Sequence, residues 1–193
     1  MKDVFGLIYT SDESDVRLRD LTRSRSIAAM PIGGRYRVID VLLSNMVHSD
    51  ITNVGLITQR NYHSLMDHLE SGKAWDLNRK RDGLFILPPY VTRSNTGGYA
   101  GMLDAIRSNL GYVRRASQRY ALISGSSTVF NTTFDDMMKK HMESGADITI
   151  LYNVPGEGEL FSDADRTYLK LDENNRVVDI EVSPHLPSYP NVS

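Results

Sequence analysis

The stretch Arg17-Leu-Arg-Asp-Leu-Thr-Arg-Ser-Arg-Ser-Ile-Ala-Ala-Met-Pro-Ile-Gly-Gly-Arg-Tyr-Arg-Val-Ile-Asp40 decides the fold of this chain. A short apolar run, Val4–Tyr9, precedes it, and apolar residues at helical spacing follow from Val38 to Val47. A buried strand, a loop and an amphipathic helix are therefore expected in that order. This is the opening unit of an α/β sheet.

The same alternation continues along the chain. Short apolar runs predict strands, and most of them are apolar enough to be covered on both faces of a mostly parallel sheet. Helical periodicity occupies the segments between them. The expected strands are Val4–Tyr9, Asn53–Thr58, Leu84–Leu87, Tyr120–Ser124 and Asp147–Tyr152, and further helices are expected at Asn61–Leu69, Leu103–Val113 and Thr133–Glu143.

The pattern changes near residue 168. Tyr168–Leu171 and Arg176–Val182 flank a polar Asp-Glu-Asn-Asn turn, which predicts an antiparallel hairpin. The Pro-rich tail, 184–193, is expected to be irregular. With 193 residues the chain suits one domain, residues 1–193.

Composition excludes several classes of function. A net charge of −2 gives no reason to expect nucleic acid or an anionic membrane as partner. The chain has no Cys, which rules out disulfides, thiolate metal sites and a thiol nucleophile. No apolar run is long enough for a signal peptide or a membrane span, so we expect a cytoplasmic protein.

Several motifs, in the correct order, resemble those of sugar-phosphate nucleotidyltransferases, and most closely those of the bacterial glucose-1-phosphate adenylyltransferase (ADP-glucose pyrophosphorylase) family. The resemblance rests on Arg17-Leu-Arg-Asp-Leu-Thr22, Arg37-Val-Ile-Asp40, Leu43-Ser-Asn45, Leu56-Ile-Thr-Gln59 and Gly98-Tyr-Ala-Gly101. It implies a doubly wound, mostly parallel nucleotide-binding sheet with its ligand at the carboxyl ends of the strands. The family's C-terminal left-handed β-helix has no counterpart, and we expect the chain to be a truncated form of the nucleotidyltransferase-like domain that lacks its last strands.

The chain departs from the family pattern where phosphoryl transfer needs charge. The resemblance implies a Gly-rich phosphate loop at Thr10–Val16, which here holds no Gly and three acidic residues. It implies a Lys where this chain has Ile27, and a Mg²⁺-binding Asp where this chain has Ser126. A neutral hydroxyl is a poor substitute for a carboxylate as a Mg²⁺ ligand. It also implies Glu-Lys at Val182-Ser183, where the family holds its sugar phosphate. These four positions predict a degraded catalytic site.

Other residues of the pattern remain. The resemblance assigns Arg17, Gln59, Gly101 and Asp104 to nucleotide binding, although these residues are equally explained by the fold: Gly101 as a tight helix entry and Asp104 in a first helical turn.

The basic segment around Arg25, Arg35 and Arg37 is either a solvated surface or a site for a phosphorylated effector, because Arg binds phosphate through two parallel hydrogen bonds. We expect no metal site, since His63 and His68 lie five residues apart and do not share one helical face.

Three hypotheses follow. The first is a non-catalytic, regulatory-type subunit that modulates a catalytic partner subunit in glycogen biosynthesis, with ATP or a sugar phosphate as its effector and no cofactor. The second is an active adenylyltransferase in which Asp104 binds Mg²⁺ and Arg25 replaces the missing Lys. The third is a sensor that binds ATP or a sugar phosphate without turnover. Missing strands would leave apolar surface exposed, so self-association is also expected.

Overall fold

The computed structural model describes residues 1–11, 18, 20–89, 98–154, 166–186 and 188–192. The chain divides into two compact units, Met1–Asp135 and Asp136–Ser193. Each is described by itself, and the expectation of one domain over 1–193 stays a prediction. No helix among the described residues is long and apolar enough to cross a membrane.

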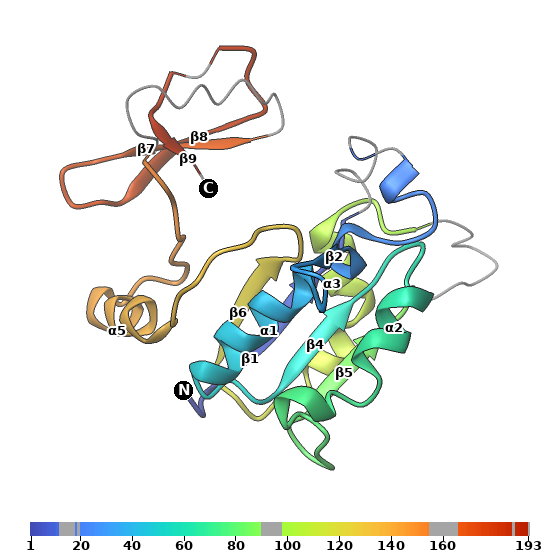
Figure 1. Cartoon of the computed structure of the whole chain (residues 1–193). Coiled ribbons are helices and arrows are strands. Elements are labelled where there is room, and N and C mark those ends of the chain that lie inside the picture. Colours follow the sequence, from blue (N-terminus) through green and yellow to red (C-terminus); the bar gives the residue numbers. More distant parts are fainter. Residues whose placement is uncertain (12–17, 19, 90–97, 155–165, 187, 193) are drawn as a thin grey trace. The chain divides into compact units, whose positions relative to one another are not determined.

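The first unit is built on a four-stranded parallel sheet (Figure 1). Its strands are β1 (Val4–Tyr9), β4 (Val54–Ile57), β5 (Leu84–Leu87) and β6 (Tyr120–Gly125), in the order β5-β4-β1-β6. All six residues of β1 and all four of β4 are buried, which confirms the prediction of strands covered on both faces. β5 and β6 are the edge strands and are more exposed.

Helices cover both faces of this sheet. α1 (Val38–His48) packs on one face, where Met46 lies against Gly6 of β1. On the other face, Phe5, Leu7 and Tyr9 form a cluster with Ala105 of α3 (Met102–Ser108) and Tyr112 of α4 (Leu110–Val113). Because successive strand residues point to opposite faces, β1 serves both helical layers. This is the doubly wound arrangement that was expected.

The remaining elements of this unit are short. Helix α2 (His63–Leu69) follows β4, and η2 (Ile27–Ala29) and η3 (Lys73–Trp75) are single 3₁₀ turns. A two-stranded ribbon, β2 (Pro31–Ile32) with β3 (Tyr36–Arg37), leads into α1.

Helix α5 (Asp135–Ser144) begins at the boundary between the two units, and the rest of it belongs to the second. A three-stranded antiparallel sheet follows, in the order β8-β7-β9. β7 (Thr167–Leu171) and β8 (Val177–Val182) form the predicted hairpin. Its turn is held by Asp172, whose Oδ1 accepts hydrogen bonds from the N–H groups of Asn174 and Arg176 at 2.9 and 2.8 Å. The polar turn therefore forms as its sequence indicated.

Two expectations for the second unit were wrong. Asp147–Tyr152 is not a strand; Ile148 and Leu151 are 78% and 57% exposed. An apolar run shows that a strand is possible, but not that a partner strand is available to accept its backbone hydrogen bonds. The Pro-rich tail is not wholly irregular, because β9 (Asn191–Val192) pairs with β7.

The second unit has an exposed edge strand. Val178, Ile180 and Val182 alternate along β8 and are 56%, 50% and 72% exposed. Charged side chains lie between them, and Asp179 accepts a hydrogen bond from the Tyr189 hydroxyl at 2.8 Å. This bond lowers the pKa of the Asp179 carboxyl and raises the pKa of Tyr189.

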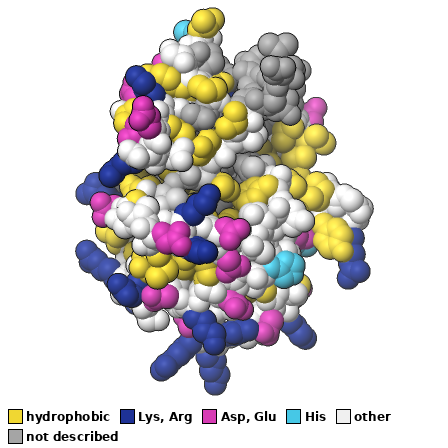
Figure 2. Space-filling model, turned by 90° about the vertical axis from the view of Figure 1, so that its left-hand side faces the viewer, with side chains coloured by type: hydrophobic (Ala, Val, Ile, Leu, Met, Phe, Trp, Pro, Cys, Tyr) yellow, Lys and Arg dark blue, Asp and Glu magenta, His cyan; other side chains and the backbone are white. Residues whose placement is uncertain are grey.

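Hydrophobic side chains are visible among charged ones on the face of the molecule shown in Figure 2.

Candidate functional site

The carboxyl ends of the parallel strands define the candidate site. The strand order reverses at β1, which lies between β4 and β6. In open α/β sheets, ligands bind outside the carboxyl ends of the strands at such a reversal. The residues that directly follow β1, β4 and β6 at the carboxyl edge of the sheet are therefore the candidates for ligand contact.

Neutral side chains occupy the two central strand ends. Tyr9 and Gly125 are register partners, so Thr10 and Ser126 follow at the same edge of neighbouring strands. Both are buried, 2% and 5% exposed. The Thr10 hydroxyl donates to the carbonyl of Ile57 at 3.2 Å, which ties the end of β1 to β4. Neither residue brings a charge to this position.

Gln59, two residues beyond β4, is bound by its own chain. Its Oε1 accepts a hydrogen bond from the backbone N–H of Tyr99 at 3.1 Å, and its Nε2 donates to the Tyr9 hydroxyl at 2.7 Å and to the Tyr99 carbonyl at 3.4 Å. The side chain is buried, and residue 59 as a whole is 6% exposed. Both ends of the amide of Gln59, which was predicted to bind nucleotide, are thus engaged within the chain.

Gly98 permits this contact. A Cβ at residue 98 would lie 2.5 Å from Gln59 Oε1, closer than any real Cβ contact. The glycine of the Gly98-Tyr-Ala-Gly101 motif is therefore required by the approach of Gln59 to the Tyr99 backbone.

Gly101 and Asp104 lie at the start of α3. Gly101 has an extended backbone, and a Cβ there would meet no atom within 4 Å. The expectation of a tight helix entry at Gly101 was therefore wrong, because there is room for a side chain. Asp104 does lie in the first helical turn, and its Oδ2 accepts from the N–H of Ala100 at 3.1 Å.

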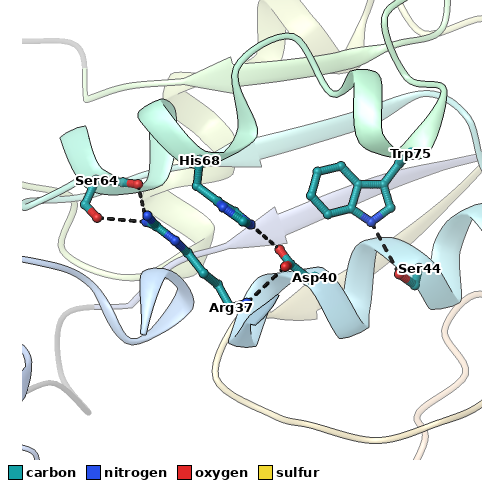
Figure 3. A network of polar contacts seen from close by, with 6 residues as sticks. All are labelled: Arg37, Asp40, Ser44, Ser64, His68 and Trp75. Atoms are coloured by element: carbon teal, nitrogen blue, oxygen red, sulfur yellow. Dashed lines mark hydrogen bonds and ion pairs between the residues drawn. The ribbon is translucent and has the colours of Figure 1, made fainter. Parts of the chain in front are cut away.

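Of the three arginines predicted to bind phosphate, Arg37 is engaged in the fold (Figure 3). Its guanidinium donates to the Ser64 hydroxyl at 2.8 Å and also to the Ser64 carbonyl, which joins β3 to α2. Arg35 is exposed and Arg25 half-buried. Arg17 and acidic residues 12, 13 and 15 lie outside the described residues.

Three further predicted positions remain, one in the first unit and two in the second. Ile27 begins the 3₁₀ turn η2, after Ser26, whose hydroxyl is the single buried side-chain polar atom without a hydrogen-bond partner in the described part of the chain. Val182 and Ser183 end β8, and Val182 is 72% exposed. Ser183 donates its N–H to the carbonyl of Arg166 at 2.8 Å.

The residues at the two central strand ends are poor ligands for Mg²⁺. Proteins usually hold this cation through carboxylate oxygens, and Thr10 and Ser126 bring hydroxyl groups instead. In the residues that the structure describes, no three His, Asp or Glu side chains gather closely enough to hold a metal ion. His68, which sequence reasoning weighed as a ligand, instead contacts Asp40, with Nε2 and Oδ1 2.7 Å apart.

Sequence reasoning missed Tyr9 and Asn109 as parts of this site. The Asn109 side chain donates to the Tyr99 hydroxyl at 3.1 Å, and that hydroxyl donates to the carbonyl of Pro88 at 3.4 Å. A signal for Asn109 was present, because this polar residue directly follows the last residue of α3. No local signal marks Tyr9, which is one of several apolar residues in a buried strand.

The sequence of the chain also matches the model of a known protein family, in agreement with this fold. Residues 14–188 match the model of the nucleotidyl transferase family. The chain belongs to the nucleotidyl transferase family. The resemblance inferred from the sequence motifs is thereby confirmed at the level of the family.

Individual relatives show what the chain is similar to within this family. It is 45% identical to the glycogen biosynthesis protein GlgD of Bacillus subtilis (strain 168) over 135 residues, which is 70% of this chain and 39% of the relative. It is 41% identical to a glucose-1-phosphate adenylyltransferase of Thermomicrobium roseum over 151 residues, 78% of this chain and 35% of the relative. The chain thus spans less than half the length of these curated relatives.

A solved structure shares the fold. A Bacillus anthracis structure named as a glucose-1-phosphate thymidylyltransferase superposes with a TM-score of 0.74, covering 98% of this chain and 68% of that chain. The two sequences are 15% identical, so the likeness establishes the nucleotidyltransferase fold and nothing more specific.

Proposed function

We propose that this chain acts as a non-catalytic, regulatory-type subunit that modulates a catalytic glucose-1-phosphate adenylyltransferase subunit in glycogen biosynthesis. The observation that carries the proposal is the pair of buried, neutral residues, Thr10 and Ser126, at the central strand ends. Transfer of a nucleotidyl group develops negative charge that cations must stabilise. Ile27 replaces the expected Lys, and Ser126 the expected Asp.

The relatives support the pathway. Two similar proteins are named glycogen biosynthesis protein GlgD, from Bacillus subtilis and Geobacillus stearothermophilus, and others are named glucose-1-phosphate adenylyltransferase. A regulatory subunit would act where ATP and sugar phosphates are found, so the proposal includes a cytoplasmic location.

The effector proposed for this subunit is ATP or a sugar phosphate, bound at the basic segment around Arg25 and Arg35. Arg25 and Arg35 remain accessible, whereas the guanidinium of Arg37 is bound to Ser64. An exposed Arg can bind a phosphate bidentately. Regulation then requires that the affinity for the effector, or the strength of the contact between the subunits, differ between the active and inactive states of the partner.

Pyrophosphate release from ATP and glucose-1-phosphate tests the proposal. The protein is assayed alone and mixed with the catalytic subunit from the same organism. We expect no release from the protein alone and a changed rate or saturation curve in the mixture. If sedimentation detects a complex but the mixture shows the same rate and saturation curve as the catalytic subunit alone, the regulatory role is contradicted.

The second candidate function is an active glucose-1-phosphate adenylyltransferase with non-standard site residues. The 41% identity to the Thermomicrobium roseum protein favours it. It requires Asp104 as the Mg²⁺ ligand and Arg25 as the substitute cation. Pyrophosphate release by the protein alone, lost in Asp104→Asn or Arg25→Gln, would establish this function in place of the first.

A further inference from the structure

Two loops meet at the amino edge of the parallel sheet, the edge opposite the candidate site. One loop leads into β5, and the other follows α4 and leads into β6. The Gln118 side chain joins them, because it donates to Asp82 Oδ1 at 3.2 Å and accepts from the Asn53 side chain at 2.9 Å. The two loops therefore lie side by side, although β5 and β6 are the outermost strands of the sheet.

Both loops carry exposed cations. Arg81 precedes Asp82 and Arg119 follows Gln118, so the bond between these two loops brings both sets of positive charge together. Lys and Arg side chains also gather at the lower end of the first unit in Figure 2. We call this surface the amino-edge patch, and its members are all exposed: Arg79, Lys80, Arg81, Arg114, Arg115 and Arg119.

Few carboxylates oppose these cations, and each already has a partner. Asp76 is paired with Arg79, Asp82 accepts from Gln118, and Asp3 accepts from the backbone N–H of Arg119 at 3.2 Å. Like charges held on one surface repel each other, and an anionic partner relieves this repulsion. Within the described part of the chain, no ion pair is formed by the side chains of Lys80, Arg81, Arg114 or Arg115.

The charge of the rest of the chain favours a protein partner over a nucleic acid. Residues 1–135 hold 17 Lys or Arg and 13 Asp or Glu, a net charge of +4, and residues 136–193 hold 5 and 11, a net charge of −6. Neither unit has the strongly basic character that is typical of nucleic-acid-binding domains. A local group of Arg side chains instead suits carboxylates, which Arg binds through two parallel hydrogen bonds, and Arg is enriched at protein interfaces.

We infer that the amino-edge patch is a docking surface for a carboxylate-rich surface of a partner protein. This inference goes beyond the proposed function, because the patch lies at the opposite edge of the sheet from the candidate site and requires no ligand there. Since exposed side chains make the contact, dissolved salt screens it and weakens the binding.

Binding of fluorescently labelled poly-L-glutamate to the full chain tests the inference, with anisotropy measured over a series of NaCl concentrations. The whole chain has a net charge of −2, so any binding of this polyanion must come from a local positive surface. We expect saturable binding at low salt and a steady loss of affinity as the salt rises. No saturable binding at low salt would overturn the inference.

Double-stranded DNA is the second probe, compared at the same concentration of anionic groups. Tighter binding of DNA than of poly-L-glutamate would overturn the assignment of the patch to a protein partner. Binding of poly-L-glutamate that equals or exceeds that of DNA supports it.

Reversal of charge on either loop should weaken the binding. Lys80→Glu combined with Arg81→Glu replaces two attractions by two repulsions, so we expect the affinity for poly-L-glutamate to fall by about tenfold or more. Arg114→Glu combined with Arg115→Glu should have the same effect from the other loop. Unchanged affinity in both double variants would overturn the inference.

The matched control is Lys139→Glu combined with Lys140→Glu on α5, where both side chains are also exposed. It changes the net charge by the same amount, yet the affinity should stay within about threefold of that of the unmodified chain, because screening limits the effect of charges outside the patch. An equal loss in the control would show that net charge alone governs the binding, and the inference would fail. Pyrophosphate release is a separate measurement, so failure of the proposed function is distinguishable from failure of this inference.

Discussion

At the residue scale, Tyr112 shows how tightly the amino end of the sheet is packed. Its ring lies against Gly55 of β4, and its hydroxyl donates to Asn53 Oδ1 at 2.8 Å. Asn53 in turn donates to Gln118, and Gln118 donates to Asp82. Burial, with a smaller contribution from the negative charge of Asp82, raises the pKa of Tyr112 well above its ordinary value. Such a buried, satisfied chain of polar groups fixes one arrangement of the core.

Gly55→Ala is expected to destabilise the protein. The added Cβ would lie 2.5 Å from the Tyr112 ring, which is held by its hydroxyl and cannot move aside freely. Overpacking of this kind costs about 1–3 kcal/mol in the free energy of unfolding. Urea unfolding measures this cost, with Gly6→Ala for comparison, where the Cβ meets the flexible end of Met46. A cost for Gly55→Ala no larger than that for Gly6→Ala would contradict the argument.

At the element scale, side chains rather than backbone contacts attach α2 and η3 to α1 (Figure 3). Asp40 in the first turn of α1 accepts from the N–H of Arg37 at 2.9 Å through Oδ2, and its Oδ1 contacts His68 of α2. Trp75 of η3 donates to the Ser44 hydroxyl of α1 at 3.3 Å. One carboxylate therefore caps one helix and contacts a second.

Asp40→Ala removes the helix cap and the contact with His68 together. Hydrogen bonds to a charged group stabilise by about 1.5–3 kcal/mol, so a loss of unfolding free energy in this range is expected. The matched control is Asp67→Ala on the exposed side of α2, which should stay within about 0.5 kcal/mol of the unmodified protein. Equal losses in the two variants would show that the Asp40 contacts contribute nothing.

At the scale of the whole molecule, both units expose large apolar side chains. In the first unit Ile123 of the edge strand β6 is 49% exposed, and in the second unit Ile180 and Leu186 are 50% and 86% exposed. β6 contains no charged residue and no Pro, the usual features that protect an edge strand from pairing with another chain.

Self-association is therefore expected to depend on concentration. Sedimentation velocity over a range of protein concentrations should show a rise in the average sedimentation coefficient. Ile123→Lys places a charge on the β6 edge and should reduce the association, because charged side chains disfavour edge-to-edge pairing. A single monomer at every concentration in the unmodified chain would contradict the prediction.

Particular elements show how far prediction from sequence reached. Leu84–Leu87 was predicted with its observed bounds, and β1 likewise, because short apolar runs flanked by turns leave few alternatives. Asp147–Tyr152 is also rich in apolar residues but does not form a strand. The difference lies in whether a partner strand is present, which is not a local property.

The sequence by itself determined the parallel α/β architecture, because apolar periodicity is a local property. Its motifs carried the resemblance to the family and, with it, the finding that Ile27 and Ser126 stand where charged residues were expected. Only the tertiary structure decided that Gln59 pairs with the Tyr99 backbone and that Arg37 binds Ser64. Those contacts join residues 40 and 27 positions apart, and each depends on how two separately predicted elements pack. The sequence marks Gln59 as a candidate for nucleotide binding, but only the packed fold shows that its amide is already bound within the chain.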